Sequence, residues 1–335
     1  MSRPLLLALL ALAACDFSPA LDIETPPYEA ATVVRAVLAA GDVARVRVSV
    51  SRDPYAVDSS GAGLELRPSR TDGRVVLLRD GAEVEELRAL DRTCYREQAT
   101  TCNEATGRFE STQSGPFACG IYVGTVRLEA GATYTVRAEA PGLPTAESTV
   151  AVPDLPTLEA AEEAGPNGLR RFRVRLSDPL PAGHRYGLTI LREYDRYTGS
   201  VCRVGGREDT LVVLSRPAQY RSDFATTDPV LVTAAREAGS SIHFVTFPDD
   251  AFDGRSRDFV LDATPLGTHP GDIGTVIVQL TSMTAELYDA YQILNFELDE
   301  NPFAEPADLP LNVGGGFGRV GAVATAVVRL AGLGG

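Results

Sequence analysis

Apolar and polar side chains alternate along several stretches of this chain. The clearest are residues 45–50, 134–140 and 171–176, where every second residue is apolar. A period of two is typical of a β-strand that has one face in the core and the other in water. These stretches therefore predict half-buried strands.

One hairpin is predicted from the residues of its turn. The apolar run 75–78 and the run 84–87, which begins with Val84 and ends with Leu87, flank the pair Asp80-Gly81. An Asp-Gly pair in this setting favours a type I′ turn, because both central residues of that turn have positive φ. We therefore predict that the two runs pair as antiparallel strands.

The recurrence of short strands between turn residues predicts a mainly-β fold in two domains. We expect an immunoglobulin-like β-sandwich over residues 28–153. A second mainly-β domain is expected over residues 154–335, because about 320 residues exceed what one core usually holds. The proline-containing stretch 151–156 is the expected join, and the acidic stretch 159–168 is expected to form a loop or a short helix.

The second half also holds one segment with a helical pattern. Thr284 is a suitable N-cap for a helix that runs to about Leu294, with Leu287 and Tyr291 on the same face as Leu294. Around it, further strands are expected at residues 187–191, 210–214, 242–247, 259–263 and 275–280.

The N-terminus has the features of an export signal. Arg3 precedes ten apolar residues, 5–14, and Cys15 follows them. Ten residues are about half of the ~20 that a membrane-spanning helix needs. The tetrad Leu12-Ala13-Ala14-Cys15 resembles the lipobox of bacterial lipoproteins, in which the Cys is acylated and becomes the first residue. We therefore expect a signal peptide over 1–14 and a lipidated Cys15 with a tether over 15–27. The alternatives are an ordinary cleaved signal and a buried helix.

The net charge and the lack of a long apolar stretch after residue 14 limit the classes of partner. The formal net charge is -14, which argues against a nucleic-acid-binding face, since such a face is basic. No later stretch holds 18 unbroken apolar residues, so acyl chains on Cys15 are the expected link to the membrane. The location expected from these features is the envelope of a Gram-negative bacterium, with the outer membrane as the favoured site.

Four cysteines follow Cys15, namely Cys94, Cys102, Cys119 and Cys202. An even number in an exported chain favours disulfides, with free thiols and a metal site as alternatives. We expect Cys94 to pair with Cys102, as the local pair, and Cys119 to pair with Cys202. The metal alternative lacks a close C-x-x-C pair.

Catalytic motifs are absent from the sequence. The chain has no H-E-x-x-H, P-loop or G-x-S-x-G pattern. A Ser-His-Asp triad stays open, because its members need not be close in sequence, but the three histidines (His184, His243 and His269) are scattered. Asp249, Asp250 and Asp253 beside Gly254 form a weak calcium candidate, and an ordinary acidic turn is the favoured interpretation. We expect neither a cofactor nor a catalytic residue.

The C-terminal region carries a specific motif, and we single out the following residues in it: Asn301, Pro302, Phe303, Glu305, Pro306, Asn312, Gly314, Gly315, Gly316 and Gly318. The two prolines hold an extended path, so Phe303 between them is expected to fill the core of the second domain. The glycines permit positive φ and are expected to turn the chain into a closing strand over 322–330. The alternatives are a loop that contacts a partner and, less favoured, a phosphate cradle.

This motif, the lipobox and the sandwich-like first half resemble the lipoprotein family called domain of unknown function 4249. The resemblance implies an envelope location and genes often adjacent to those of TonB-dependent outer-membrane receptors. The family's activity is unknown, so the resemblance implies no catalytic residues. We therefore expect a non-enzymatic binding or accessory lipoprotein, with a TonB-dependent receptor as its implied partner. The alternatives are an envelope hydrolase with a dispersed site and a structural or adhesion module.

Overall fold

The structure is a computed structural model that describes residues 27–51, 53, 69–103, 105–166, 169–178, 183–194, 197–214, 218–237, 244–252, 254–263, 272–297 and 311–331. Its first half contains β1 (Thr32–Ala39), β2 (Val43–Val50), β3 (Arg74–Arg79), β4 (Ala82–Ala89), β5 (Thr93–Asn103), β6 (Arg108–Ala118), β7 (Ile121–Arg127), β8 (Thr133–Glu139) and β9 (Ala146–Ala151). The strands that follow are β10 (Thr157–Ala164), β11 (Arg170–Ser177), β12 (Arg185–Tyr194), β13 (Tyr197–Val204), β14 (Arg207–Leu214), β15 (Ala218–Ser222), β16 (Phe224–Thr226), β17 (Val245–Pro248), β18 (Ser256–Ala263), β19 (Asp272–Met283) and β20 (Phe317–Leu330). The helices are α2 (Pro229–Glu237) and α3 (Ala285–Glu297). The predicted mainly-β class is confirmed.

The first lobe is a sandwich of two β layers. One layer has the strand order β20-β1-β2-β7, and the other has the order β4-β3-β8-β9, with β4 joined to both β7 and β3. Alternate residues of these strands point inward and form one hydrophobic core, which includes Val34, Val46, Leu77 and Val136. The alternation recognised in the sequence therefore places one face of each strand in this core.

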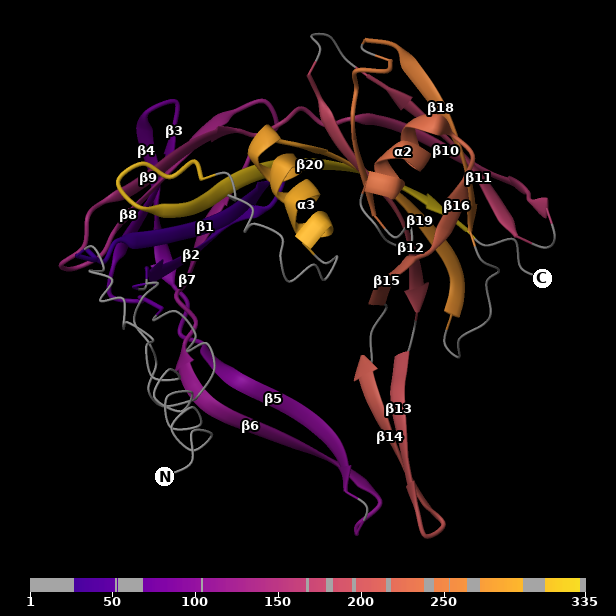
Figure 1. The fold of residues 1–335 in the computed structure, drawn as a ribbon, viewed down its shortest axis with the longest axis horizontal. Coiled ribbons are helices and arrows are strands. Elements are labelled where there is room, and N and C mark those ends of the chain that lie inside the picture. Colours follow the sequence, from indigo (N-terminus) through magenta and orange to yellow (C-terminus); the bar gives the residue numbers. More distant parts are fainter. Residues whose placement is uncertain are drawn as a thin grey trace, which may run out of the picture.

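The second lobe is also layered, and its core is richer in aromatic side chains. The strands β15, β12, β19 and β20 face a smaller sheet of order β10-β11-β18-β16. Phe172, Phe247 and Phe259 are completely buried between the layers, and α2 adds Leu231. Figure 1 shows the two lobes side by side, with β20 running through both.

Strand β20 connects the lobes through its hydrogen bonds. Residues 317–323 pair in parallel with β1, and residues 323–330 pair antiparallel with β19. One mixed sheet of 12 strands therefore runs through both lobes within the described residues. Because this sheet is continuous, the division of the chain at residue 153 stays a prediction.

The predicted β3–β4 hairpin and the helix are confirmed, with one difference in detail. Asp80 and Gly81 both have positive φ, 50° and 84°, as a type I′ turn requires. Helix α3 begins directly after Thr284, but the Thr284 hydroxyl accepts a hydrogen bond from the Ala322 amide of β20 at 3.3 Å. Thr284 therefore ties the helix to the sheet.

The acidic stretch after residue 156 is a strand, so the predicted loop or short helix is wrong there. Strand β10 pairs with β11 along its whole length. Its acidic residues face arginines across the ladder, with Glu159 opposite Arg175 and Glu163 opposite Arg171. Opposite charges on neighbouring strands stabilise the pairing. The sequence of the acidic stretch alone does not reveal its arginine partners on β11.

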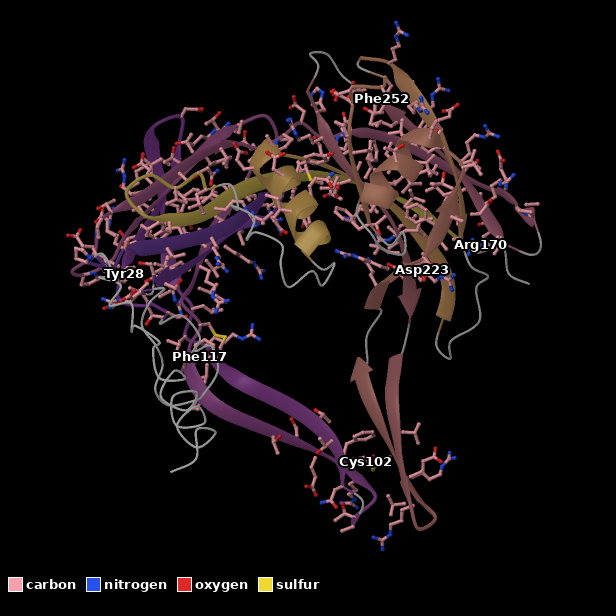
Figure 2. All side chains as sticks on the ribbon, viewed as in Figure 1. Tyr28, Cys102, Phe117, Arg170, Asp223 and Phe252 are labelled. Carbon is pink, nitrogen blue, oxygen red and sulfur yellow. A yellow bond between two sulfur atoms is a disulfide. The ribbon has the colours of Figure 1, made fainter. Side chains whose placement is uncertain are left out.

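Two long hairpins extend from the lobes and meet at their ends. Hairpin β5–β6 leaves the first lobe and hairpin β13–β14 leaves the second, and Figure 1 shows both running toward the bottom of the view. A disulfide between Cys102 and Cys202 joins them where Figure 2 labels Cys102. The Phe109 amide also donates to the Asp209 carboxylate at 3.0 Å. The hairpins therefore form a covalently closed arch.

The expected disulfides are present, but the predicted pairing is wrong. Cys94 pairs with Cys119, and Cys102 pairs with Cys202. Cys94 and Cys102 lie on one strand, β5, where eight residues span roughly 26 Å. Disulfide-linked Cα atoms are only about 5–6 Å apart. The extended strand between these cysteines therefore excludes the predicted pairing.

Candidate functional site

Three arginines form a row across neighbouring strands of the first lobe. In the pairing register, Arg35 of β1 lies opposite Arg47 of β2 on one side and opposite Arg319 of β20 on the other. Residues directly opposite each other in a sheet point to the same face. Like charges in such positions destabilise a sheet, so this row favours the binding of negative charge.

The row lines a cleft of about 670 Å³ on the outer face of the sheet. Two more arginines contribute to it: Arg45, which is two residues before Arg47 on the same face of β2, and Arg92, which follows β4. The apolar side chains of the cleft are Val37, Leu90, Ile121, Val123, Leu287 and Leu311. The cleft therefore combines a positive floor with apolar walls.

For four of the five arginines in this cleft, the described residues supply no neutralising carboxylate. Within the described part of the chain, no ion pair is found for Arg45, Arg47, Arg92 or Arg319. The lining includes no Asp or Glu. In a chain of net charge -14, five arginines around one cleft form a local region of opposite sign.

Arg319 is the most enclosed arginine for which the direction of a pKa shift is resolved. Burial lowers the pKa of its guanidinium from the ordinary value. An arginine stays protonated at neutral pH even so. The lowered pKa shows that the Arg319 guanidinium has lost part of its hydration and that no carboxylate among the described residues compensates for the loss. A bound anion would supply that compensation.

The glycines of the C-terminal motif bring β20 close to its neighbours. Gly318 has φ of +118°, and a Cβ at this position would lie 1.9 Å from the Val34 carbonyl oxygen. At Gly315, with φ of +70°, a Cβ would lie 2.2 Å from the Thr145 carbonyl oxygen. Only glycine fits such positions, so Gly318 lets β20 approach β1 and set Arg319 beside Arg35.

The rest of the described motif holds the start of this strand. The Asn312 side chain donates to the Val320 carbonyl at 2.7 Å and accepts from the Val320 amide at 2.9 Å. Gly314 exchanges two backbone hydrogen bonds with Glu147 of β9, and Gly316 leads into β20. Residues 301–310, which include Asn301, Pro302, Phe303, Glu305 and Pro306, lie outside the described residues. The core-filling role of Phe303 stays a prediction.

The structure places Asp249 and Asp250, two residues of the weak calcium candidate, in different environments. Asp249 is completely buried, and its carboxylate accepts hydrogen bonds from the backbone amides of Gly183 and His184. Asp250 is exposed, and Asp253 lies outside the described residues. The carboxylates of Asp249 and Asp250 therefore occupy different environments. His243, His269 and Cys15 also lie outside the described residues, and no helix among those described is long and apolar enough to cross a membrane.

The arginine cleft is not evident from the sequence. Arg45 and Arg47 alternate with valines, a pattern that predicts only the solvent-exposed face of a strand. The local signal, two arginines two residues apart on a strand, is common on surfaces. The decisive information is the register of β1 with β20, which joins the two ends of the chain and has no local signature.

Comparisons with known proteins complete the description. No curated protein matches the chain. Among solved structures, the collagen binding domain of the surface protein RspB of Erysipelothrix rhusiopathiae is similar at 9% identity over 89% of this chain and 95% of that chain, with a TM-score of 0.20. A likeness this low carries no argument about function. A family model described as "Domain of unknown function (DUF4249)" matches residues 20–329. Because the match covers nearly the whole length, the chain belongs to the family of domain of unknown function 4249.

Proposed function

We propose that this protein is a lipid-anchored cell-envelope protein that binds a small anionic ligand in the arginine cleft and does not act on it chemically. The observation that carries the proposal is the row of Arg319, Arg35 and Arg47 across three paired strands. Like charges in these positions do not stabilise the sheet. They would stabilise a bound anion.

The cleft indicates the class of ligand. Guanidinium groups bind carboxylates and phosphates through two parallel hydrogen bonds. Strands lie about 4.8 Å apart, so the outer two residues of the row are separated by roughly 10 Å. That span suits a ligand with two or more anionic groups, and the apolar walls suit a hydrocarbon or aromatic part. A volume of about 670 Å³ is in the range of small-molecule sites.

The composition of the cleft supports binding without catalysis. Its described lining consists of arginine, aliphatic side chains and Gly318. It includes no carboxylate, imidazole, thiol or hydroxyl that could act as a nucleophile or exchange a proton at neutral pH. Arginine alone can orient and hold an anion. This lining therefore supports a binding protein over the envelope hydrolase.

Anchoring and transport are the second part of the proposal. The lipobox-like tetrad that ends at Cys15 supports a lipid anchor, and the family resemblance supports a role beside a TonB-dependent receptor. In such a role the cleft would capture an anionic solute at the membrane and deliver it to the receptor. The lobe that carries the cleft begins shortly after the tether, so the cleft would lie near the membrane.

Calorimetric titration tests the binding proposal. The probes are pyrophosphate, citrate and 1-naphthyl phosphate, with 1-naphthol as the neutral counterpart. Charge-assisted hydrogen bonds contribute about 1.5–3 kcal/mol each, so Arg47→Gln and Arg319→Gln should each weaken anion binding at least tenfold. Arg173→Gln, which alters an exposed arginine paired with Glu163, is the matched control and should bind like the wild type. Equal affinities for all three variants would refute the cleft as the site.

Fractionation and affinity capture test the anchor and the partner. Cys15→Ala should release the protein from membranes that are washed with high salt. The wild-type lipoprotein, captured from detergent-solubilised envelopes, should co-purify with a TonB-dependent receptor. Retention of the variant in membranes would contradict the lipid anchor, and capture of no receptor would contradict the uptake role. Neither outcome bears on anion binding by the cleft.

A further inference from the structure

A second group of ionisable side chains lies in the other lobe. Asp178 follows β11, His184 precedes β12, and Asp249 follows β17. One ligand atom from each residue lies within 4.8 Å of the others. The residues adjoin the turn that carries Phe252, which Figure 2 labels in the second lobe. None of the three lines the arginine cleft.

We propose that Asp178, His184 and Asp249 bind a divalent transition-metal ion. Both carboxylates are buried, with side-chain exposures of 0% and 1%. Within the described residues, neither of them has an arginine partner. Two buried carboxylates so close together repel each other and require positive charge nearby. A divalent ion with a neutral imidazole balances both charges, whereas an imidazolium balances one.

The position of His184 supports coordination. Its Nδ1 atom is buried and has no hydrogen-bond partner. It lies 3.5 Å from an Asp178 carboxylate oxygen and 3.4 Å from an Asp249 carboxylate oxygen. These separations are long for hydrogen bonds. They match the roughly 3.3–3.4 Å between neighbouring ligands of a tetrahedral zinc ion with bonds of about 2.0–2.1 Å.

The surrounding hydrogen bonds hold the carboxylates in place. Asp178 accepts from the Tyr186 hydroxyl and from the Gly254 amide, the latter at 2.7 Å. Asp249 accepts from the Gly183 and His184 amides at 3.0 and 2.8 Å. Such contacts orient metal ligands in known sites. An ionised carboxylate accepts at about four positions, so Asp178 keeps unused lone pairs, and Asp249 keeps them on Oδ1, because its Oδ2 already accepts both amides.

The exposed part of the cluster is the His184 ring, whose side chain is 24% exposed while its Nδ1 atom and both carboxylates are buried. Three protein ligands would leave a fourth position for water. Mixed imidazole and carboxylate ligands suit zinc and manganese better than calcium, which takes six to eight oxygens. The bound ion would link the connection between β11 and β12 to the turn between β17 and β18.

Metal titration of the full chain, prepared without a histidine tag and treated with a chelator, tests the proposal. Zinc is the calorimetric probe, and cobalt(II) reports four-coordinate binding through its visible absorption. The wild type should bind one ion per chain with a raised melting temperature. His184→Ala and Asp249→Asn should weaken binding at least 100-fold and abolish the shift in melting temperature. Asp250→Asn, the exposed neighbour, is the matched control and should behave like the wild type.

The same titration can overturn the proposal. If the wild type binds no zinc or cobalt at neutral pH, His184 serves only as an ion-pair partner of the two carboxylates. If His184→Ala binds as tightly as Asp250→Asn does, the ion is held elsewhere. Should Asp249→Asn fail to fold, His184→Ala decides alone, because it removes a partly exposed imidazole and leaves both carboxylates in place.

Discussion

Two strands of this protein carry the same pattern of arginines and differ in what surrounds them. In β2, Arg45 and Arg47 alternate with buried valines. In β11, Arg171, Arg173 and Arg175 alternate with a buried Phe, Val and Leu. The neighbours of β11 are acidic, since Arg171 forms two 2.8 Å hydrogen bonds with Asp262 and Arg173 forms one with Glu163. On β2, the neighbour β1 places Arg35 opposite Arg47, and β7 places apolar residues opposite Arg45 and Arg47.

The difference separates a structural surface from a binding surface. On β11 each arginine side chain contributes to the pairing of β10, β11 and β18, because its charge meets a carboxylate on an adjacent strand. On β2, Arg47 meets Arg35 across the ladder, and β7 places no carboxylate opposite Arg45 or Arg47. The sequence of one strand therefore does not reveal whether its arginines stabilise the fold or serve a ligand. The identity of the neighbouring strand decides.

Replacement of Gly318 should break the arginine row and produce the largest effect. In Gly318→Ala, the new Cβ would meet the Val34 carbonyl oxygen, and alanine would have to adopt a φ of +118°. Strain of this kind amounts to about 1–3 kcal/mol before the clash is included. We expect a loss of at least ~3 kcal/mol in the free energy of unfolding, measured by urea denaturation, and loss of anion binding.

A second glycine separates the clash from the backbone strain. Gly41 also has a positive φ, +81°, but a Cβ there would meet no atom within 4 Å. Gly41→Ala should therefore lose only about 1 kcal/mol and bind anions normally. If the two variants are equally stable, close approach of β20 to β1 is not what positions Arg319.

Replacement of one arginine on β2 should raise stability, and replacement of one on β11 should lower it. Arg47→Gln removes a like charge opposite Arg35, so stability should rise by about 0.2–1 kcal/mol without ligand. Arg171→Gln removes an ion pair on a partly exposed surface, so stability should fall by about 0.2–1 kcal/mol. Urea denaturation at low ionic strength measures both.

Salt supplies the control for this experiment. Both differences should shrink toward zero at about 0.5 M NaCl, because exposed charges are screened there. A change of the same sign in the two variants would mean that the row is not electrostatically strained in the absence of ligand. The distinction between the two surfaces would then fail.

The same contrast explains which features could be predicted from the sequence. The β3–β4 hairpin was predictable, because the Asp80-Gly81 turn and both strands lie within a few residues of one another. The acidic strand β10 was misinterpreted, because its role depends on arginines in the next strand. The arginine cleft was missed, because it depends on the pairing of β1 with β20, near opposite ends of the chain. The cysteine pairing was wrong for a related reason, since it required knowing that β5 is extended.

The smallest expected effect concerns acid stability, and it distinguishes the two surfaces by pH. The hydrogen bonds from Arg171 lower the pKa of Asp262 below its ordinary value, more than burial raises it. A carboxyl group with a lowered pKa in the folded state contributes stability above its unfolded pKa of about 3.9, and that contribution is lost as pH falls through the folded pKa. Below about pH 4, Asp262→Asn should therefore lose less stability than the wild type does.

Arg47→Gln, which alters no carboxylate partner, should follow the acid profile of the wild type. Far-UV circular dichroism of urea unfolding between pH 2 and 6 is the appropriate measurement, because the chain contains no Trp. Identical profiles for Asp262→Asn and the wild type would show that the pairing on β11 contributes no acid-sensitive stability, and the contrast between the two arginine surfaces would then rest on ligand binding alone.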